Sequence, residues 1–160
     1  MQVLRREVAK LYDCVTEENI LIAAPEELIY LTMTALLGPG STMVVTYPGY
    51  QSLYEVARGR GCNVRKWTPR KDTSGRWFFD IADLQALMDD TVTMLTINFP
   101  HNPTGDLLSH GDMQRVVQLA AEHDAWLIAD EMYRGLGARQ LVDQDCKHVS
   151  LVTLCLTWTN

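Results

Sequence analysis

Four short stretches of the sequence hold side chains that could bind a ligand, and each follows an apolar run. They are AAPEE at 23–27, YPGY at 47–50, PHNPTG at 100–105 and DEMYRG at 130–135. Asp130 offers a carboxylate, Asn102 an amide, and Tyr50 and Tyr133 offer aromatic rings with hydroxyl groups. Each also has an ordinary structural use, because Asn before Pro with a following Gly is a turn signal and a single Tyr often packs in a core.

The elements that must position these stretches alternate between helices and strands. Helical spacing of apolar residues predicts helices over 3–12, 25–37 and 50–58, and further helices that begin at the capping residues Asp80 and Ser109. Apolar runs predict strands at 19–24, 42–47, 63–67, 92–99, 125–130 and 149–156, and a polar loop is expected at 69–76.

Alternation of this kind, with nearly continuous apolar strands, predicts an α/β fold. We expect a three-layer sandwich in which helices cover both faces of a mostly parallel sheet. Ligands of such sheets bind beyond the carboxyl ends of the strands. The four stretches all lie there, so they are expected to line one crevice.

Composition limits the class of protein. The chain has 160 residues, 47% of them hydrophobic and 21% charged, which indicates one soluble globular domain. A net charge of −6 argues against nucleic acid and anionic membranes as partners, and no apolar stretch is long enough to span a bilayer. The start of the sequence does not read as a signal peptide. The four cysteines are scattered without metal-ligand spacing, which favours reduced thiols, a cytoplasmic location and no metal site.

Taken in order, the motifs resemble one known family. ENILIAAPEE, GPGSTMVVTYPGY, NFPHNPTG and IADEMY follow one another as they do in the large domain of fold-type I pyridoxal-phosphate enzymes, specifically the class I/II aminotransferases. Each motif alone is weak, but the ordered series is specific. The resemblance begins near the first residue and runs to about Gly137.

The resemblance implies a role for each residue at the strand ends. Asp130 matches the aspartate that pairs with the pyridine nitrogen of pyridoxal 5'-phosphate and keeps it protonated, so that the ring can accept electrons from the substrate's α-carbon. Tyr133 and Asn102 match the two donors to the phenolic oxygen of the cofactor. Tyr50 matches the aromatic residue that stacks on its ring.

The phosphate-binding position departs from the family pattern. Relatives hold the phosphate with a small residue followed by Gly and with the N–H groups that open the next helix. Ala24 stands here in place of the usual Gly, and Pro25 has no N–H to offer. The backbone N–H groups of Ala24 and Glu26 are the candidates that remain.

The resemblance also implies parts that this sequence does not show. The family's catalytic lysine, which binds the cofactor covalently, lies in a Ser-x-Ser-Lys segment after a further strand. None of the four lysines (Lys10, Lys66, Lys71 and Lys147) has that context. We therefore expect residues 1–160 to be a partial large domain without a catalytic residue, an amino-terminal arm or a carboxy-terminal small domain.

The function implied is transfer of an amino group from an amino acid to a 2-oxo acid, in an enzyme that is a homodimer when intact. Alone, this chain is expected to bind the cofactor weakly without turnover. Two alternatives stay open. The parent could be a lyase, decarboxylase or synthase of the same fold, or the chain could be a non-catalytic fragment that pairs with a full-length subunit. Arg134 is expected in a surface salt bridge and His101 as a solvated turn residue.

Overall fold

A five-stranded sheet forms the centre of the computed structural model, which describes residues 2–12, 15–134 and 151–153. The helices are α1 (Gln2–Ala9), the 3-10 helix η1 (Glu17–Asn19), α2 (Pro25–Leu36), α3 (Ser52–Gly59), α4 (Ile81–Leu87) and α5 (His110–Glu122). The strands are β1 (Thr42–Thr46), β2 (Asn63–Trp67), β3 (Arg70–Lys71), β4 (Trp77–Phe78), β5 (Val92–Asn98), β6 (Trp126–Asp130) and β7 (Leu151–Thr153).

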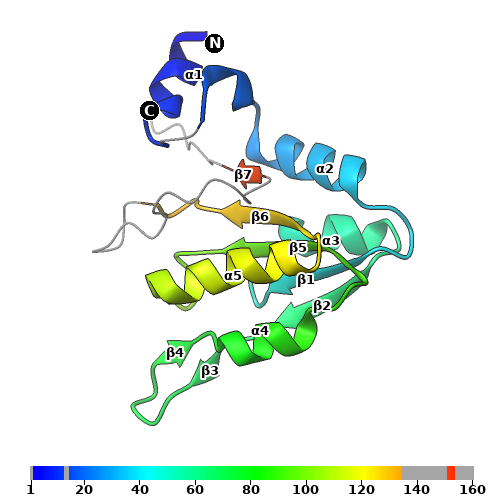
Figure 1. Cartoon of the computed structure of the whole chain (residues 1–160), viewed down its shortest axis with the longest axis vertical. Coiled ribbons are helices and arrows are strands. Elements are labelled where there is room, and N and C mark those ends of the chain that lie inside the picture. Colours follow the sequence, from blue (N-terminus) through cyan, green and yellow to red (C-terminus); the bar gives the residue numbers. More distant parts are fainter. Residues whose placement is uncertain (1, 13–14, 135–150, 154–160) are drawn as a thin grey trace.

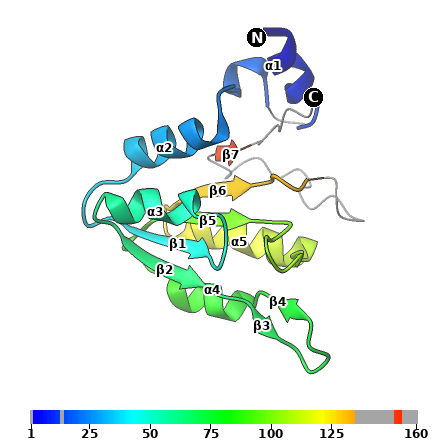
Figure 2. The same ribbon diagram turned by 180° about the vertical axis from the view of Figure 1, so that it is seen from behind.

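The layers of the structure are those expected from the sequence. The strand order is β2-β1-β5-β6-β7, and every neighbouring pair in this sheet is parallel. Helices α2 and α3 lie on one face and α4 and α5 on the other, as the two opposite views show (Figures 1 and 2). The predicted α/β three-layer sandwich is therefore confirmed.

Two apolar clusters fill the spaces between the sheet and the helices. One contains Trp67, Leu95 and Val116 and lies under α4 and α5. The other contains Met33 and Met43 and lies under α2 and α3. All five residues of β1 are buried, which is the burial expected for a strand covered on both faces.

The predicted helix starts at Asp80 and Ser109 are confirmed. The Asp80 carboxylate accepts the N–H of Ala82 at 2.9 Å, and the Ser109 hydroxyl oxygen accepts the N–H of Asp112 at 3.1 Å. These side chains satisfy backbone donors that have no partner within the first turn of a helix.

Two predicted segments differ from the structure. The strand expected at 19–24 is wrong, because the chain forms η1 and then continues without strand pairing. Asn19 accepts the N–H of Thr16 at 2.9 Å, so a local side-chain bond holds a turn where strand pairing was expected. The loop expected at 69–76 holds β3 and the turn of the β3–β4 hairpin, and β4 follows directly after it. The Asp72 carboxylate closes this turn by accepting the N–H of Ser74 at 2.8 Å. Of the strand expected at 149–156, β7 is described and the remainder lies outside the described residues.

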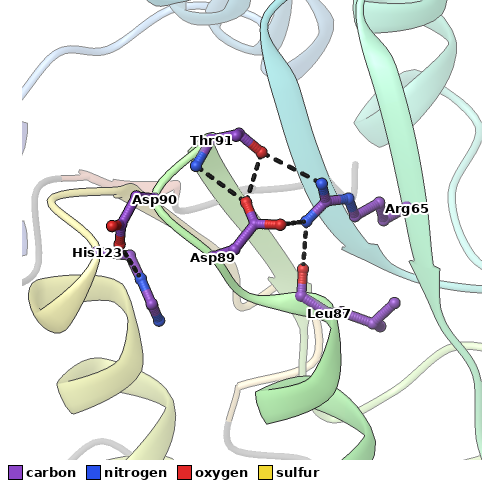
Figure 3. A network of polar contacts seen from close by, with 6 residues as sticks. All are labelled: Arg65, Leu87, Asp89, Asp90, Thr91 and His123. Carbon is purple, nitrogen blue, oxygen red and sulfur yellow. Dashed lines mark hydrogen bonds and ion pairs between the residues drawn. The ribbon is translucent and has the colours of Figure 1, made fainter.

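A polar network fixes the start of β5 to the edge strand β2 (Figure 3). The Arg65 guanidinium donates to the Leu87 carbonyl and the Asp89 carboxylate, each at 2.8 Å, and to the Thr91 hydroxyl at 3.2 Å. Hydrogen bonds from the Thr91 side chain and backbone, and then from Arg65, lower the pKa of Asp89 to about 2. Because this network precedes β5, it lies at the amino end of that strand. It therefore stabilises the edge of the sheet that is opposite to the candidate site.

Candidate functional site

The candidate site lies beyond the carboxyl ends of β1, β5 and β6. In the parallel register, Asn98 at the end of β5 stands opposite Asp130 at the end of β6. The segments that follow these strands contact one another, so the structure brings them to one edge of the sheet, as expected.

Asp130 is a carboxylic acid held almost entirely inside the protein, with 5% of its surface exposed. Burial raises its pKa above the ordinary value of 3.8, and a hydrogen bond from the Met132 N–H to Oδ1, at 3.0 Å, opposes the shift only in part. Among the described residues, this N–H is the one hydrogen-bond donor to its carboxylate. A cationic group placed beside it would compensate for the buried charge.

Asn102 and Tyr133 lie side by side, although they come from different strand ends. The Asn102 side-chain amide donates to the Tyr133 hydroxyl at 3.3 Å. Asn102 is exposed and Tyr133 is partly buried, so both polar groups are available near the surface. The Tyr133 hydroxyl can in turn donate to a ligand oxygen placed between them.

Asn98 is a residue that the sequence analysis missed. Its side chain is buried, and its amide donates to the backbone carbonyl of Asp130 at 3.1 Å while its Oδ1 accepts the N–H of Asn102 at 3.0 Å. One side chain therefore sets the positions of two candidate ligand-binding residues. The available signal was a polar residue in the apolar run of β5, where both faces of the strand are covered.

His101 is not a solvated turn residue, and that prediction is wrong. Its ring is 2% exposed and packs edge-on against Phe79, with 4.5 Å between the ring centroids. The ring is buried because both of its nitrogens have partners inside the protein, at Thr104 Oγ1 and the Pro48 carbonyl.

Tyr50 and Glu26 connect the first two of the four stretches, at 23–27 and 47–50. The Tyr50 hydroxyl donates to the Glu26 carboxylate, and this bond, followed by one from Ser52, lowers the pKa of Glu26. Tyr50 is 44% exposed, so part of its surface is accessible to a ligand. Ala24 is the residue before α2, and Pro25 occupies the first helical position, as expected.

Arg134 forms a salt bridge, as expected, but its partner lies inside the protein. It donates to Oε2 of Glu131 at 3.1 Å, and its guanidinium lies over the Tyr12 ring, 4.5 Å from the centroid. Glu131 is 5% exposed, and burial raises its pKa. Arg134 thus compensates a buried acid at the end of β6.

The lysines in the described part of the chain have contacts of their own. Lys10 pairs with Glu7, Lys66 lies over the Tyr47 ring and Lys71 lies over the Trp77 ring. Lys147 lies outside the described residues. Cys62 is a buried free thiol, and the other three cysteines lie outside the described residues.

The described residues contain neither a metal-binding cluster nor a membrane-spanning helix. Within them, no group of three or more His, Cys, Asp or Glu side chains could hold a metal ion. In the same residues, no helix combines the length and apolar character needed to cross a membrane.

The side chains at this edge fit pyridoxal 5'-phosphate as a ligand. The buried Asp130 carboxyl would gain from the positive charge of a protonated pyridine nitrogen. The adjacent Asn102 and Tyr133 supply donors for an anionic oxygen, and Tyr50 supplies an aromatic face. The amino-terminal end of α2 attracts anions, although the exposed Glu26 carboxylate opposes this effect.

Comparisons with known proteins point to one family. The sequence model for aminotransferase class I and II matches residues 2–154. The chain is 29% identical to human tyrosine aminotransferase over 155 residues, covering 94% of the chain and 33% of that protein. It is 32% identical to alanine aminotransferase of Mycobacterium bovis over 137 residues, covering 82% of the chain and 30% of that protein.

Solved structures agree with the sequence comparisons. A PLP-dependent aminotransferase from Streptococcus suis superposes with a TM-score of 0.75 at 28% identity, over 82% of this chain and 35% of the other. The chain spans about a third of the length of the curated relatives that it matches.

The raised pKa of Asp130 predicts how pH affects stability. The folded chain holds this proton more tightly than the unfolded chain does, so the carboxyl contributes stability that is full below pH 3.8 and is lost as pH rises through its raised pKa. The Asp130→Asn variant has no carboxyl to deprotonate, so it does not lose this stability as pH rises. Its side-chain oxygen can still accept the Met132 N–H. In urea unfolding of the cofactor-free chain from pH 4 to pH 8, the stability of the variant relative to wild type should therefore rise with pH.

The matched control is Glu18→Gln, which removes one negative charge from an exposed site on η1. A difference between Asp130→Asn and wild type that stays constant across this pH range would contradict the raised pKa.

Proposed function

Because the chain belongs to the class I and II aminotransferases, we propose that residues 1–160 form part of the domain that binds pyridoxal 5'-phosphate in such an enzyme. The observation that carries the proposal is the buried carboxyl of Asp130 at a strand end, next to the contacting pair of Asn102 and Tyr133. The activity proposed for the whole protein is transfer of an amino group from an amino acid to a 2-oxo acid.

In this proposal the residues would contact different parts of the cofactor. Bound pyridoxal phosphate supplies an electron sink for the α-carbon of an amino acid. The Asp130 carboxylate would accept a hydrogen bond from the protonated pyridine nitrogen and stabilise its charge. Asn102 and Tyr133 would donate to the phenolic oxygen, while Tyr50 would cover one face of the ring and exclude water from it.

The phosphate is proposed to lie at the start of α2. The backbone N–H groups of Ala24 and Glu26 are the candidate donors there, assisted by the helix dipole. The Glu26 carboxylate accepts the Tyr50 hydroxyl, although its negative charge opposes an anion at the same helix end. The bond ties the proposed phosphate segment to the proposed stacking residue.

This chain by itself is proposed to hold the cofactor without a covalent bond. None of its lysines stands in the Ser-x-Ser-Lys context of the family, and the described ones have contacts with Glu7, Tyr47 and Trp77. We expect reversible binding without transamination by the 160-residue chain. A cytoplasmic location is proposed from the reduced cysteine Cys62 and the absence of disulfide spacing.

The binding proposal predicts opposite effects of one substitution. Asp130→Asn should stabilise the cofactor-free chain at neutral pH, as argued above, yet weaken binding of pyridoxal phosphate roughly 10–100-fold, which corresponds to the loss of one charge-assisted hydrogen bond. Cofactor absorbance and tryptophan fluorescence in titrations at pH 7.5 measure the affinity, and Glu18→Gln serves again as the control. After borohydride treatment, the intact mass should be unchanged. Equal affinity of Asp130→Asn and wild type, or a borohydride-stable adduct, would contradict the proposal.

A homodimer is proposed for the intact enzyme. Large apolar side chains are exposed at the amino-terminal side of the structure, including Val3 on α1, Leu21, and Tyr30 and Leu31 on α2. Large apolar side chains left exposed to solvent are a common feature of protein interfaces. Sedimentation equilibrium of the chain should give a mass that increases with concentration, and Leu31→Glu should shift it toward the monomer. A monomer at all concentrations would argue against this face as an interface of the chain.

A further inference from the structure

His101 and Asn102 are neighbours in the chain but occupy different environments. The His101 side chain is buried and packs against Phe79, whereas Asn102 is exposed next to Tyr133. The loop after β5 thus holds one polar residue inside the protein and presents the next one to the proposed cofactor site. The inner residue is not accounted for by the proposed cofactor contacts.

The hydrogen bonds of His101 define which of its ring nitrogens carries a proton. Nε2 lies 2.9 Å from the carbonyl oxygen of Pro48, and a carbonyl can only accept, so Nε2 is the donor. Nδ1 lies 2.7 Å from the Thr104 hydroxyl. Burial lowers the pKa of the ring, which favours the neutral form. In that form Nδ1 accepts a hydrogen bond from Thr104.

The bond to Pro48 joins two segments that lie far apart in the sequence. Pro48 is two residues before Tyr50, the proposed stacking residue, and His101 is next to Asn102. The segments also approach each other at Gly49, where an added Cβ would lie 3.3 Å from the Thr46 carbonyl oxygen and 3.8 Å from that of Asn102. The distance to Asn102 is that of ordinary van der Waals contact, so the two segments touch at Gly49 as well as through the His101 bond.

The loop that carries His101 is itself held firmly. The His101 N–H donates to the Asp106 carbonyl at 2.9 Å, and its own carbonyl accepts the N–H of Gly105 at 2.7 Å. Asn98 holds the N–H of Asn102 from the strand below. Because this loop is fixed, the hydrogen bond from His101 to Pro48 also fixes the position of the segment at 47–50.

We propose that His101 is a positioning residue for cofactor binding: by donating from Nε2 to the Pro48 carbonyl, it fixes Tyr50 relative to Asn102. The two residues would then meet the pyridine ring of the cofactor from its face and its edge at the same time. This inference rests on the proposed function, since it assigns His101 a role in the same site.

Two substitutions at His101 distinguish the effect of the hydrogen bond to Pro48 from the effect of losing the histidine ring. In His101→Gln, the side-chain NH2 is as many bonds from Cα as Nε2 is, so it can still donate to Pro48. In His101→Asn, the amide is one bond shorter and matches Nδ1 instead, so the bond to Pro48 is lost. His123→Gln, on the histidine that contacts the exposed Asp90, is the matched control.

We expect the affinity for pyridoxal phosphate to fall roughly 5–10-fold in His101→Asn, the cost of about one hydrogen bond, and to change less than about 2-fold in His101→Gln. Hydrogen exchange of the cofactor-free chain should be faster at residues 47–50 in His101→Asn than in His101→Gln or wild type. Nitrogen NMR of labelled histidine should show His101 with a protonated Nε2 and an unprotonated Nδ1.

Each outcome decides the inference. A protonated Nδ1 with an unprotonated Nε2 overturns it, and so does wild-type affinity in His101→Asn when the wild-type chain binds the cofactor. If the wild-type chain does not bind the cofactor, the proposed function fails for this chain. Hydrogen exchange at residues 47–50 then tests the role of His101 alone. Faster exchange in His101→Asn than in His101→Gln supports the contact between His101 and Pro48, and equal exchange in both variants overturns the inference.

Discussion

Parallel pairing of β5 with β6 is the constraint on which the candidate site depends. It places Asn98 opposite Asp130, and from there the Asn98 side chain bonds the backbone of Asp130 on one side and of Asn102 on the other. A slip of β6 by one residue in this register would turn the Asp130 side chain to the opposite face of the sheet and move its carbonyl away from the Asn98 amide. The apolar clusters on both faces of the sheet oppose such a slip, because they bury alternate residues of each strand.

Asp130 and Glu131 are neighbouring acids at the end of β6, and their different partners indicate which of the two is available to a ligand. Burial raises the pKa of both Asp130 and Glu131. Arg134 and the Tyr12 hydroxyl both donate to Oε2 of Glu131, and the Arg134 guanidinium lies beside this carboxylate as a positive charge, while Oε1 has no partner within the described part of the chain. Asp130 receives one backbone N–H within the described part of the chain and faces the site. The free energy spent on burying this carboxyl is recovered only when a positive group approaches it.

The sequence predicted much of this arrangement because it depends on local patterns. Apolar strands between helices imply a parallel sheet, and a parallel sheet brings Asp130 and the loop of Asn102 to one edge. The burial of His101 could not be read in the same way, since its partner Pro48 lies far away in the sequence. The segment at 19–24 was misjudged for the opposite reason: the local turn held by Asn19 outweighed its apolar composition.

The most direct measurement concerns the carboxyl group of Asp130. Its titration can be followed by carbon NMR of the aspartate-labelled chain, assigned with Asp130→Asn, in the absence and presence of pyridoxal 5'-phosphate. A protonated pyridine nitrogen beside the carboxylate would favour its charged form. We therefore expect a pKa above the ordinary value in the free chain and a clear decrease when the cofactor is added. An unchanged pKa at saturating cofactor would contradict the assignment of Asp130 to the pyridine nitrogen.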